Sequence, residues 1–318
     1  MTQLTVKVVS KVVEAIDIVS LELASADGKP LPAFSAGAHI DIHLPGGIIR
    51  QYSLLNDAAE QHRYVVGVLK DPESRGGSIA VHDKVNVGDI LQISSPRNHF
   101  ELVHAQRSLL FAGGIGVTPI LCMARRLSQT SADFEMHYCT RSPERTAFQK
   151  DIQSSAFADR VHFHYDSGDD AQKLDLKALV AGPSPTTHLY VCGPTGFIDY
   201  VVNTAKAAGW SSDQIHFEYF GAAAIDTSGD QSFHVKIAST GALLEVPADK
   251  SITQVLEENK VFVPVSCEEG VCGTCLTRVL EGEPEHRDMY LTEAEQAAND
   301  QMLPCCSRAK TPVLVLDL

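Results

Sequence analysis

The first hundred residues alternate between apolar and polar positions with a period of two. In "AHIDIHLPGG" (38–47), branched apolar residues take every second position before a Pro-Gly-Gly turn. Residues 64–69 ("YVVGVL") and 88–93 ("GDILQI") are further strand candidates. Several short strands at close spacing predict a small antiparallel β-barrel in this region.

From residue 108 the pattern changes to continuous apolar runs that are separated by helix-like stretches. The run "SLLFAGG" (108–114) precedes a helix, in which we expect Thr118 as the N-cap and Pro119 in the first turn. The other strand-like runs are 134–139, 161–165, 188–192 and 215–220, and the clearest helix is 195–208. This alternation predicts an α/β domain, a parallel sheet with helices on both faces.

A third pattern follows a small, polar, glycine-containing stretch at 222–232, which has linker chemistry. Residues 233–247 predict two strands about a Thr-Gly turn, and the last residues, "PVLVLDL", predict a final strand. Between them, Ser251 and Gln254 form a capping-box signature at the start of a helix. We therefore expect three domains and one linker, with boundaries at 1–104, 105–222, 223–232 (the linker) and 233–318.

Composition is that of an ordinary globular protein, with 44% apolar and 21% charged residues among 318. No apolar run reaches the roughly 18–20 residues of a membrane span, and the N-terminus lacks a signal-peptide pattern. We expect a cytoplasmic monomer with no membrane attachment. The net charge of −14 argues against a nucleic-acid partner. The acid-rich final third either steers docking to a basic protein surface or only maintains solubility.

Cysteines are concentrated near the C-terminus, where "CEEGVCGTC" (267–275) carries three. The spacing C-x4-C-x2-C with a distant fourth cysteine is that of plant-type 2Fe–2S ferredoxins. Gly270 and Gly273 would let backbone N–H groups approach the cluster. A zinc site, which more often pairs two short Cys knuckles, and simple packing cysteines are the weaker alternatives. Register favours Cys305 over its neighbour Cys306, so the predicted ligands are Cys267, Cys272, Cys275 and Cys305.

His286-Arg287-Asp288 matches the HRD of protein-kinase catalytic loops. The kinase pattern requires Asn five positions after the Asp, where this chain has Glu293, and no Gly-rich ATP loop precedes it. We therefore reject a kinase.

Four short segments in the first two domains carry further candidate chemistry. "RQYSL" (50–54) follows a strand, and "SRGGS" (74–78) has the adjacent glycines of an anion-binding nest. "AGGIGVTP" (112–119) is not the Rossmann fingerprint, because Pro119 stands where the third glycine belongs. It still places backbone amides at the carboxyl edge of a sheet, where nucleotides bind, and "CGP" (192–194) follows a second strand.

Together with "SCEEGVCGTC", "EHRDMYLT" and "CCSRAK", these segments resemble the phthalate dioxygenase reductase family over essentially the whole chain. Its relatives include the reductase components of vanillate O-demethylase, which is the nearest likeness, and of carnitine monooxygenase. The resemblance implies a β-barrel that binds FMN, an α/β domain that binds NADH and a β-grasp ferredoxin domain that holds a 2Fe–2S cluster.

The resemblance also implies roles for residues of the barrel. Arg50 would bind the flavin phosphate, with Gln51 beside it, Tyr52 would pack by the isoalloxazine, and Ser53 would bond near its N5. The residue types suit these roles, because a guanidinium grips phosphate and an aromatic face covers a planar ring. The second phosphate contact would be Gly76, Gly77 and Ser78.

In the nucleotide domain, the resemblance implies a pyridine-nucleotide site and two further catalytic residues. Cys192 would lie beside the nicotinamide, and Phe220 in "FEYFG" would approach the flavin. Relatives that use NADH often have an Asp soon after the Arg at 141, where this chain has Ser142. Arg141 and Arg145 could accept a 2′-phosphate, so NADPH stays open, although the family favours NADH. The remaining predicted nucleotide-binding residues are Gly113, Gly114, Gly116, Thr118, Gly193 and Pro194.

These parts predict an electron-transfer flavoprotein, in which a flavin mediates between a two-electron hydride donor and a one-electron cluster. The resemblance implies that the acceptor is the Rieske-type terminal oxygenase of an aromatic dioxygenase or O-demethylase system. The alternatives are a carnitine monooxygenase-type reductase, a stand-alone NAD(P)H-dependent flavin or iron reductase, and a zinc-stabilised module without flavin.

Overall fold

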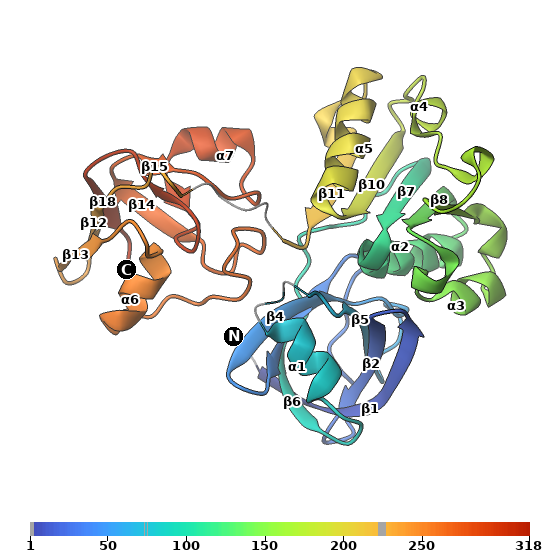
Figure 1. The fold of residues 1–318 in the computed structure, drawn as a ribbon, viewed down its shortest axis with the longest axis horizontal. Coiled ribbons are helices and arrows are strands. Elements are labelled where there is room, and N and C mark those ends of the chain that lie inside the picture. Colours follow the sequence, from blue (N-terminus) through green and yellow to red (C-terminus); the bar gives the residue numbers. More distant parts are fainter. Residues whose placement is uncertain (1–2, 73, 75, 222–226) are drawn as a thin grey trace. The chain divides into compact units, whose positions relative to one another are not determined.

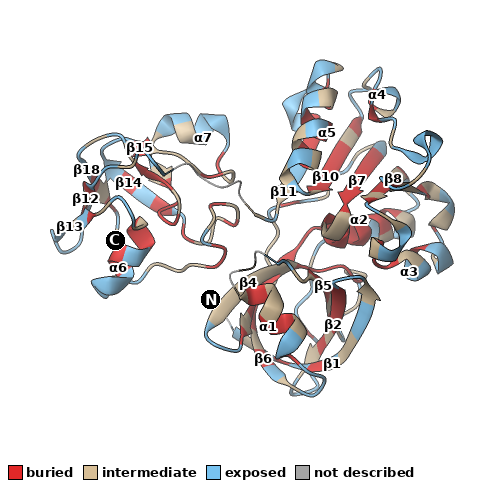
Figure 2. Ribbon diagram, viewed as in Figure 1, coloured by how far each residue is buried: buried red, intermediate tan, exposed pale blue. Residues whose placement is uncertain are grey.

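The structure is a computed structural model that describes residues 3–72, 74, 76–221 and 227–318. The chain forms two compact units, Met1–Glu218 and Tyr219–Leu318. In both units the buried residues concentrate on the strands and on the helix faces turned toward them (Figure 2). No helix in the described ranges is long and apolar enough to cross a bilayer.

The first unit begins with a six-stranded antiparallel sheet in the order β4-β3-β6-β1-β2-β5 (Figure 1). A bridge between Leu54, which follows β4, and Val66 of β5 joins its two outermost strands and closes the predicted barrel. Helix α1 (Gly77–Asp83) packs on the same core. The strands are β1 (Gln3–Ala15), β2 (Ile18–Ser25), β3 (His39–Leu44), β4 (Ile48–Ser53), β5 (Tyr64–Leu69) and β6 (Ile90–Ser94).

The same unit contains the predicted α/β sheet, in the order β11-β10-β7-β8-β9 (Figure 1). Neighbours from β10 to β9 are parallel. Crossovers from β7 and from β10 run in opposite directions along the sheet, so right-handed connections place α2 and α5 on opposite faces. The strands are β7 (Arg107–Gly113), β8 (Asp133–Thr140), β9 (Val161–Tyr165), β10 (Thr187–Gly193) and β11 (Ile215–Tyr219), and the helices are α2 (Val117–Gln129), α3 (Gln149–Ser154), α4 (Leu176–Leu179) and α5 (Thr195–Ala207).

The start of α2 corrects one prediction, because Thr118 is not the N-cap. A 3-10 turn at Gly114–Gly116 leads directly into the helix, whose N-cap is Gly116. The Thr118 hydroxyl instead donates to the Ile115 carbonyl at 3.2 Å. Pro119 lies in the first helical turn, as predicted. The glycines make the turn tight enough to continue into the helix without a side-chain cap.

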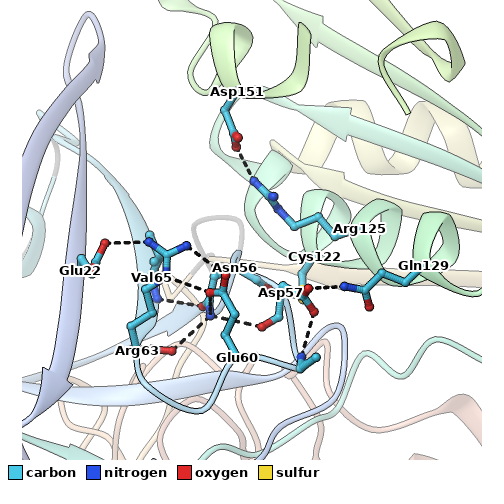
Figure 3. A network of polar contacts seen from close by, with 11 residues as sticks. Glu22, Asn56, Asp57, Glu60, Arg63, Val65, Cys122, Arg125, Gln129 and Asp151 are labelled. Carbon is cyan, nitrogen blue, oxygen red and sulfur yellow. Dashed lines mark hydrogen bonds and ion pairs between the residues drawn. The ribbon is translucent and has the colours of Figure 1, made fainter. Parts of the chain in front are cut away.

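The barrel packs directly against α2 through a position that only glycine can occupy. A Cβ on Gly67 of β5 would lie 2.8 Å from Thr118 Cγ2 and 3.0 Å from Phe148 Cζ. Nearby, Oδ1 of the buried Asn56 side chain accepts the Val65 N–H at 2.9 Å, and the Asn56 main-chain carbonyl accepts the Cys122 thiol at 3.2 Å (Figure 3). The two sheets of the first unit are therefore joined by packing and by a buried polar network.

The second unit has the predicted β-grasp arrangement, a mixed sheet in the order β13-β12-β18-β14-β16. Its strands β12 and β18 are parallel to each other. Helix α6 packs on the sheet and begins with the predicted capping box of Ser251 and Gln254. Strand bounds are β12 (Phe233–Ile237), β13 (Leu243–Val246), β14 (Thr277–Glu281), β15 (Pro284–Glu285), β16 (Gln301–Met302), β17 (Arg308–Ala309) and β18 (Val313–Leu316), and the helices are α6 (Ile252–Glu258) and α7 (Glu293–Ala298).

The predicted fold class is therefore confirmed: an antiparallel barrel, a parallel α/β sheet and a β-grasp unit. The domain boundaries themselves stay predictions, and part of the predicted linker, residues 223–226, lies outside the described residues.

Replacing Asn56 with Ala removes the acceptor of the Val65 N–H and three further bonds from Asn56 Nδ2. Because buried groups lose their partners, we expect the free energy of unfolding to fall by about 2–3 kcal/mol. Urea denaturation measures this change. Gln129→Ala, at an exposed end of the same network, should stay within about 0.5 kcal/mol. Equal losses in the two variants would show that the buried network is not what stabilises this region.

Candidate functional site

Arg50 lies on β4 against the first turn of α1. A Cβ on Gly77 would lie 2.5 Å from Arg50 Cγ and 2.9 Å from its Nε, so the absence of a side chain at 77 is what admits the arginine. Gly76, the N-cap of α1, has φ of 90°, a conformation that favours glycine. Ser78 follows, and its hydroxyl accepts the Asp71 N–H at 3.1 Å. The predicted phosphate-binding segments thus meet at one end of the barrel.

Among the described residues of the first unit, several buried side-chain polar atoms have no hydrogen-bond partner, and two of them belong to the predicted flavin site. These two are Gln51 Nε2, on the same strand as Arg50, and Glu218 Oε2, on β11. Buried polar groups are almost always paired, so an unpaired one beside a predicted binding segment is a candidate contact for a bound group. Tyr52 lies between Gln51 and Ser53 and packs on the barrel core, where burial raises the pKa of its hydroxyl. Tyr52 is therefore neutral at physiological pH.

Ser53 and Cys192, predicted from separate motifs, both come close to Glu218. The Glu218 carboxyl hydrogen-bonds to Ser53, and its charge acts on the buried Cys192 thiol. Burial raises the pKa of Glu218 to about 8, although the bond to Ser53 lowers it in part. Burial also raises the pKa of Cys192 well above its usual value, so this thiol stays neutral. Ser53, Cys192 and Glu218 form one constellation at the barrel–sheet junction.

Glu218 is not among the site residues predicted from the sequence. It stands inside "FEYFG", the segment chosen for Phe220, and a carboxylate in an otherwise apolar strand was the available signal. Phe220 itself is 41% exposed and belongs to the second unit. Its predicted role beside the flavin stays a prediction.

The two glycine-containing loops of the nucleotide domain are in backbone contact. A Cβ on Gly116 would lie 2.3 Å from the Cys192 carbonyl oxygen, and one on Gly193 would lie 2.9 Å from Gly113 Cα. Pro194 is the N-cap of α5, and Gly116 is that of α2, so the starts of two 13-residue helices converge at the carboxyl edge of the sheet. Helix N-termini favour anionic groups such as pyrophosphate.

The remaining nucleotide candidates lie in different surroundings. Arg141 is exposed directly after β8, at the same sheet edge. Arg145, the other arginine expected to meet a 2′-phosphate, instead forms an ion pair with Asp17 of the barrel at 3.3 Å. Thr118 is buried, with its hydroxyl bonded to the backbone. Arg141 is therefore better placed than Arg145 to meet a nucleotide.

In the second unit, the four predicted ligand cysteines are all buried and brought together. The Cys267 thiol hydrogen-bonds to those of Cys272 and Cys305, and Cys275 hydrogen-bonds to Cys305. The hydrogen bonds from Cys272 and Cys305 hold the pKa of Cys267 well below its usual range. Cys306 is more exposed, and its thiol contacts the Leu303 carbonyl at 3.7 Å. The choice of Cys305 over Cys306 as the fourth ligand stays a prediction.

The cluster loop, residues 267–275, holds a conformation that needs its glycines. Gly270 and Gly273 have φ of 75° and 68°. A Cβ on Gly273 would lie 2.3 Å from the Tyr290 ring, and one on Gly270 would lie 2.4 Å from Cys306 Sγ. Backbone N–H groups of Glu269 and Thr274 donate to the sulfurs of Cys267 and Cys272 at 3.4 and 3.5 Å. Such N–H···S contacts stabilise thiolate sulfur and tune a bound cluster.

The residues therefore fit the groups that the sequence predicts. Four convergent thiols with amide donors suit an iron–sulfur cluster. Arg50 at a glycine turn, with the unpartnered Gln51 Nε2 beside it, suits the phosphate and polar ring edge of a flavin.

Comparison with known proteins agrees with this architecture. Residues 235–310 match the family of 2Fe-2S iron-sulfur cluster binding domains, and residues 110–203 match that of oxidoreductase NAD-binding domains. The chain is 58% identical to vanillate O-demethylase oxidoreductase of Pseudomonas sp. (strain HR199 / DSM 7063), over 96% of each protein.

Two further similarities concern phthalate dioxygenase reductase. The Burkholderia cepacia protein of that name is 42% identical, over 99% of this chain and 97% of its own length. A solved phthalate dioxygenase reductase structure, described as modular for electron transfer from pyridine nucleotides to [2Fe-2S], matches with a TM-score of 0.78. It is 42% identical and covers 99% of this chain and 98% of its own.

Glu218→Gln should change how stability depends on pH. Because the folded pKa of about 8 lies above the ordinary value near 4.5, the folded state binds the extra proton and loses stability as pH rises between these values. Because Gln cannot ionise, the free energy of unfolding of Glu218→Gln should fall by about 2 kcal/mol less over this pH range than that of the unaltered protein. This figure allows for the half-buried position of the residue. Unfolding free energies of flavin-depleted protein at pH 5 to 8.5 measure it. An unchanged pH slope, equal to that of the exposed control Glu101→Gln, would contradict the assignment.

Cys305→Ser and Cys306→Ser separate the two adjacent thiols. Because Cys305 hydrogen-bonds to Cys267 and Cys275, two other predicted ligands, whereas Cys306 contacts the Leu303 carbonyl and Cys305 itself, only Cys305→Ser should lose most of its iron and sulfide. Iron and acid-labile sulfide assays on the purified variants, with the visible spectrum, measure this. Iron loss in Cys306→Ser, with retention in Cys305→Ser, would reverse the assignment.

Proposed function

We propose that this chain passes electrons from NADH through FMN and a 2Fe–2S cluster to a Rieske-type terminal oxygenase. The chain belongs to the oxygenase reductase family of vanillate O-demethylase oxidoreductase and phthalate dioxygenase reductase, so the expected family membership is confirmed, and it is an oxidoreductase. The observation that carries the proposal is the 58% identity to vanillate O-demethylase oxidoreductase over nearly the full length of both chains.

The barrel binds FMN through Arg50, Gln51 and the turn at Gly76–Gly77. FMN, when bound, supplies the chemistry that accepts a hydride and releases single electrons. Arg50 is the phosphate ligand, because its side chain lies against the Gly76–Gly77 turn and a guanidinium binds phosphate through two parallel hydrogen bonds. Gln51 Nε2, which is buried and unpaired, donates to a polar edge of the ring. Neutral Tyr52 supplies an aromatic face.

Ser53 and Glu218 hold a proton beside the reacting groups. Since the pKa of Glu218 is about 8, its carboxyl group is mostly protonated at neutral pH and shares a hydrogen bond with the Ser53 hydroxyl. A neutral pair places no net charge next to a hydride donor. Cys192, also neutral, packs at the end of β10 and shapes the site of the nicotinamide.

NADH binds at the carboxyl edge of the parallel sheet. The converging starts of α2 and α5 present backbone N–H groups to the pyrophosphate, and the glycines at 113, 116 and 193 let the loops approach each other. Arg141 lies at the edge where the adenosine ribose would bind. The preference for NADH over NADPH follows the family.

The partner is an oxygenase component, because the related chains are named as reductase subunits of oxygenases that act on several compounds. The Rieske type of that oxygenase, and a monomeric, cytoplasmic reductase, complete the proposal. The acidic second unit docks on a basic oxygenase surface through the exposed carboxylates of Glu257, Glu268, Glu281 and Glu283. The compound that is oxidised contacts the oxygenase and not this chain.

Reconstitution with the oxygenase component of vanillate O-demethylase tests this function. We expect NADH oxidation to yield demethylated vanillate in a coupled reaction, because the reductase then has its physiological type of acceptor. The coupled rate should fall several-fold between about 20 and 300 mM salt, since screening weakens charge steering. NADH oxidation with ferricyanide, a small acceptor, is the control. Rapid ferricyanide reduction without coupling to any Rieske oxygenase would contradict the proposal.

A second candidate function is reduction of a small acceptor such as a quinone. It is favoured by one relative, the tetrachlorobenzoquinone reductase of Sphingobium chlorophenolicum, which is 42% identical over 96% of this chain. Saturable quinone reduction that exceeds the oxygenase-coupled rate would support this alternative.

A further inference from the structure

Asp230, at the start of the second unit, is a deeply buried carboxylate. Its side chain is only 4% exposed, although the surrounding stretch was predicted to be a polar linker. Arg287 donates to both of its oxygens, at 2.5 Å to Oδ1 and 3.0 Å to Oδ2, and Arg308 Nε lies 3.4 Å from Oδ2. The carboxylate is thus held by two arginines, one of them bidentate, which is the strongest common form of ion pair.

The two arginines are themselves fixed by other partners. Arg308, 8% exposed, donates to the backbone carbonyls of Gln231, Pro247 and Lys250, and its guanidinium lies 5.0 Å from the centroid of the Phe233 ring. Arg287, 14% exposed, also contacts Glu285 at 2.8 Å. The chain that enters this unit is therefore anchored to its core at Asp230.

The segment that carries Arg287 also supports the cluster loop. The Met289 N–H donates to the Gly270 carbonyl at 3.0 Å, and a Cβ on Gly270 would lie only 3.1 Å from Asp288 Cα. The Arg287 N–H donates to Ser307 Oγ at 3.3 Å, two residues beyond Cys305. Only three consecutive residues, 287–289, therefore separate the ion pair with Asp230 from the hydrogen bond to Gly270, in the loop that holds three of the four cysteines.

This arrangement accounts for the kinase-like His286-Arg287-Asp288 motif, which the proposed function leaves unused. Arg287 faces the incoming chain, while Asp288 accepts the Leu291 N–H at 2.8 Å and packs on Gly270. One short segment thus faces in two directions, toward the incoming chain and toward the cluster loop. Breaking a buried ion pair leaves an uncompensated charge, so the segment has one favoured arrangement.

We propose that Asp230 is a positioning residue, whose bond to Arg287 fixes the cluster loop relative to the chain that leads in from the flavin-binding unit. The proposal rests on the proposed electron path and deepens it. Electron transfer into the cluster requires a defined approach of the two groups. Electron transfer slows steeply as the separation of donor and acceptor grows, so a loosened anchor slows transfer without changing either redox group.

Asp230→Asn tests this in the full-length, cofactor-loaded protein, with Glu258→Gln as the matched control. Glu258 is a carboxylate of the same unit in an exposed ion pair with Lys250. Hydrogen exchange, which does not depend on turnover, should rise in Asp230→Asn both at 227–233 and in the cluster loop. Rapid-mixing absorbance should show unchanged flavin reduction by NADH and about tenfold slower cluster reduction. Glu258→Gln should match the unaltered protein in each respect.

Exchange that rises only at 227–233, with cluster reduction unchanged, would overturn the proposal, and so would slower transfer caused by a shifted cluster potential. If Asp230→Asn does not fold, Arg287→Lys keeps the charge and loses the bidentate bond, and the same two readouts apply. If NADH does not reduce the cluster of the unaltered protein, the proposed function fails. The exchange comparison still decides whether Asp230 and the cluster loop are coupled.

Discussion

Four buried thiols, linked by hydrogen bonds from Cys272 to Cys267, Cys267 to Cys305 and Cys305 to Cys275, are the constraint on which the second unit depends. Because like charges at such distances cannot all ionise in isolation, the loop that holds them has to be kept in place by the rest of the fold. Glycines at 270 and 273 allow the loop to press against Asp288 and Tyr290, and backbone amides face the sulfurs. A cluster that needs four thiolates removes the conflict, because its irons balance their charge.

In the first unit, a carboxyl group, Glu218, is buried where the barrel and the parallel sheet meet. The loops at Gly116 and Cys192 are in backbone contact, and Glu218 of the same sheet hydrogen-bonds to Ser53 of the barrel. A permanently ionised carboxylate in that junction would be costly, and burial instead keeps Glu218 mostly protonated. The same burial holds Cys192 as a neutral thiol. The junction therefore offers hydrogen bonds to a bound ring without adding a fixed negative charge.

Much of this was predictable, because it rests on local spacing. The period-two pattern predicted the barrel, the strand–helix alternation predicted the parallel sheet, and the cysteine spacing predicted four residues that the fold brings together. Contacts between distant segments were not predictable. Glu218 acquires its environment from Ser53, which lies 165 residues earlier in the chain. Asp230 stands in a stretch with the composition of a linker, and only the fold places Arg287 and Arg308 around it. The cap of α2 failed as a prediction because a 3-10 turn precedes the helix.

The central claim is that one chain carries a nicotinamide-reducible flavin and a 2Fe–2S cluster in sequence. An anaerobic absorption spectrum of the purified protein, with flavin and iron quantified, tests it before and after one equivalent of NADH. The account predicts one flavin and two irons per chain, and loss of both absorptions on addition of NADH. A colourless protein with bound zinc, or a flavin and cluster that NADH does not reduce, would contradict it.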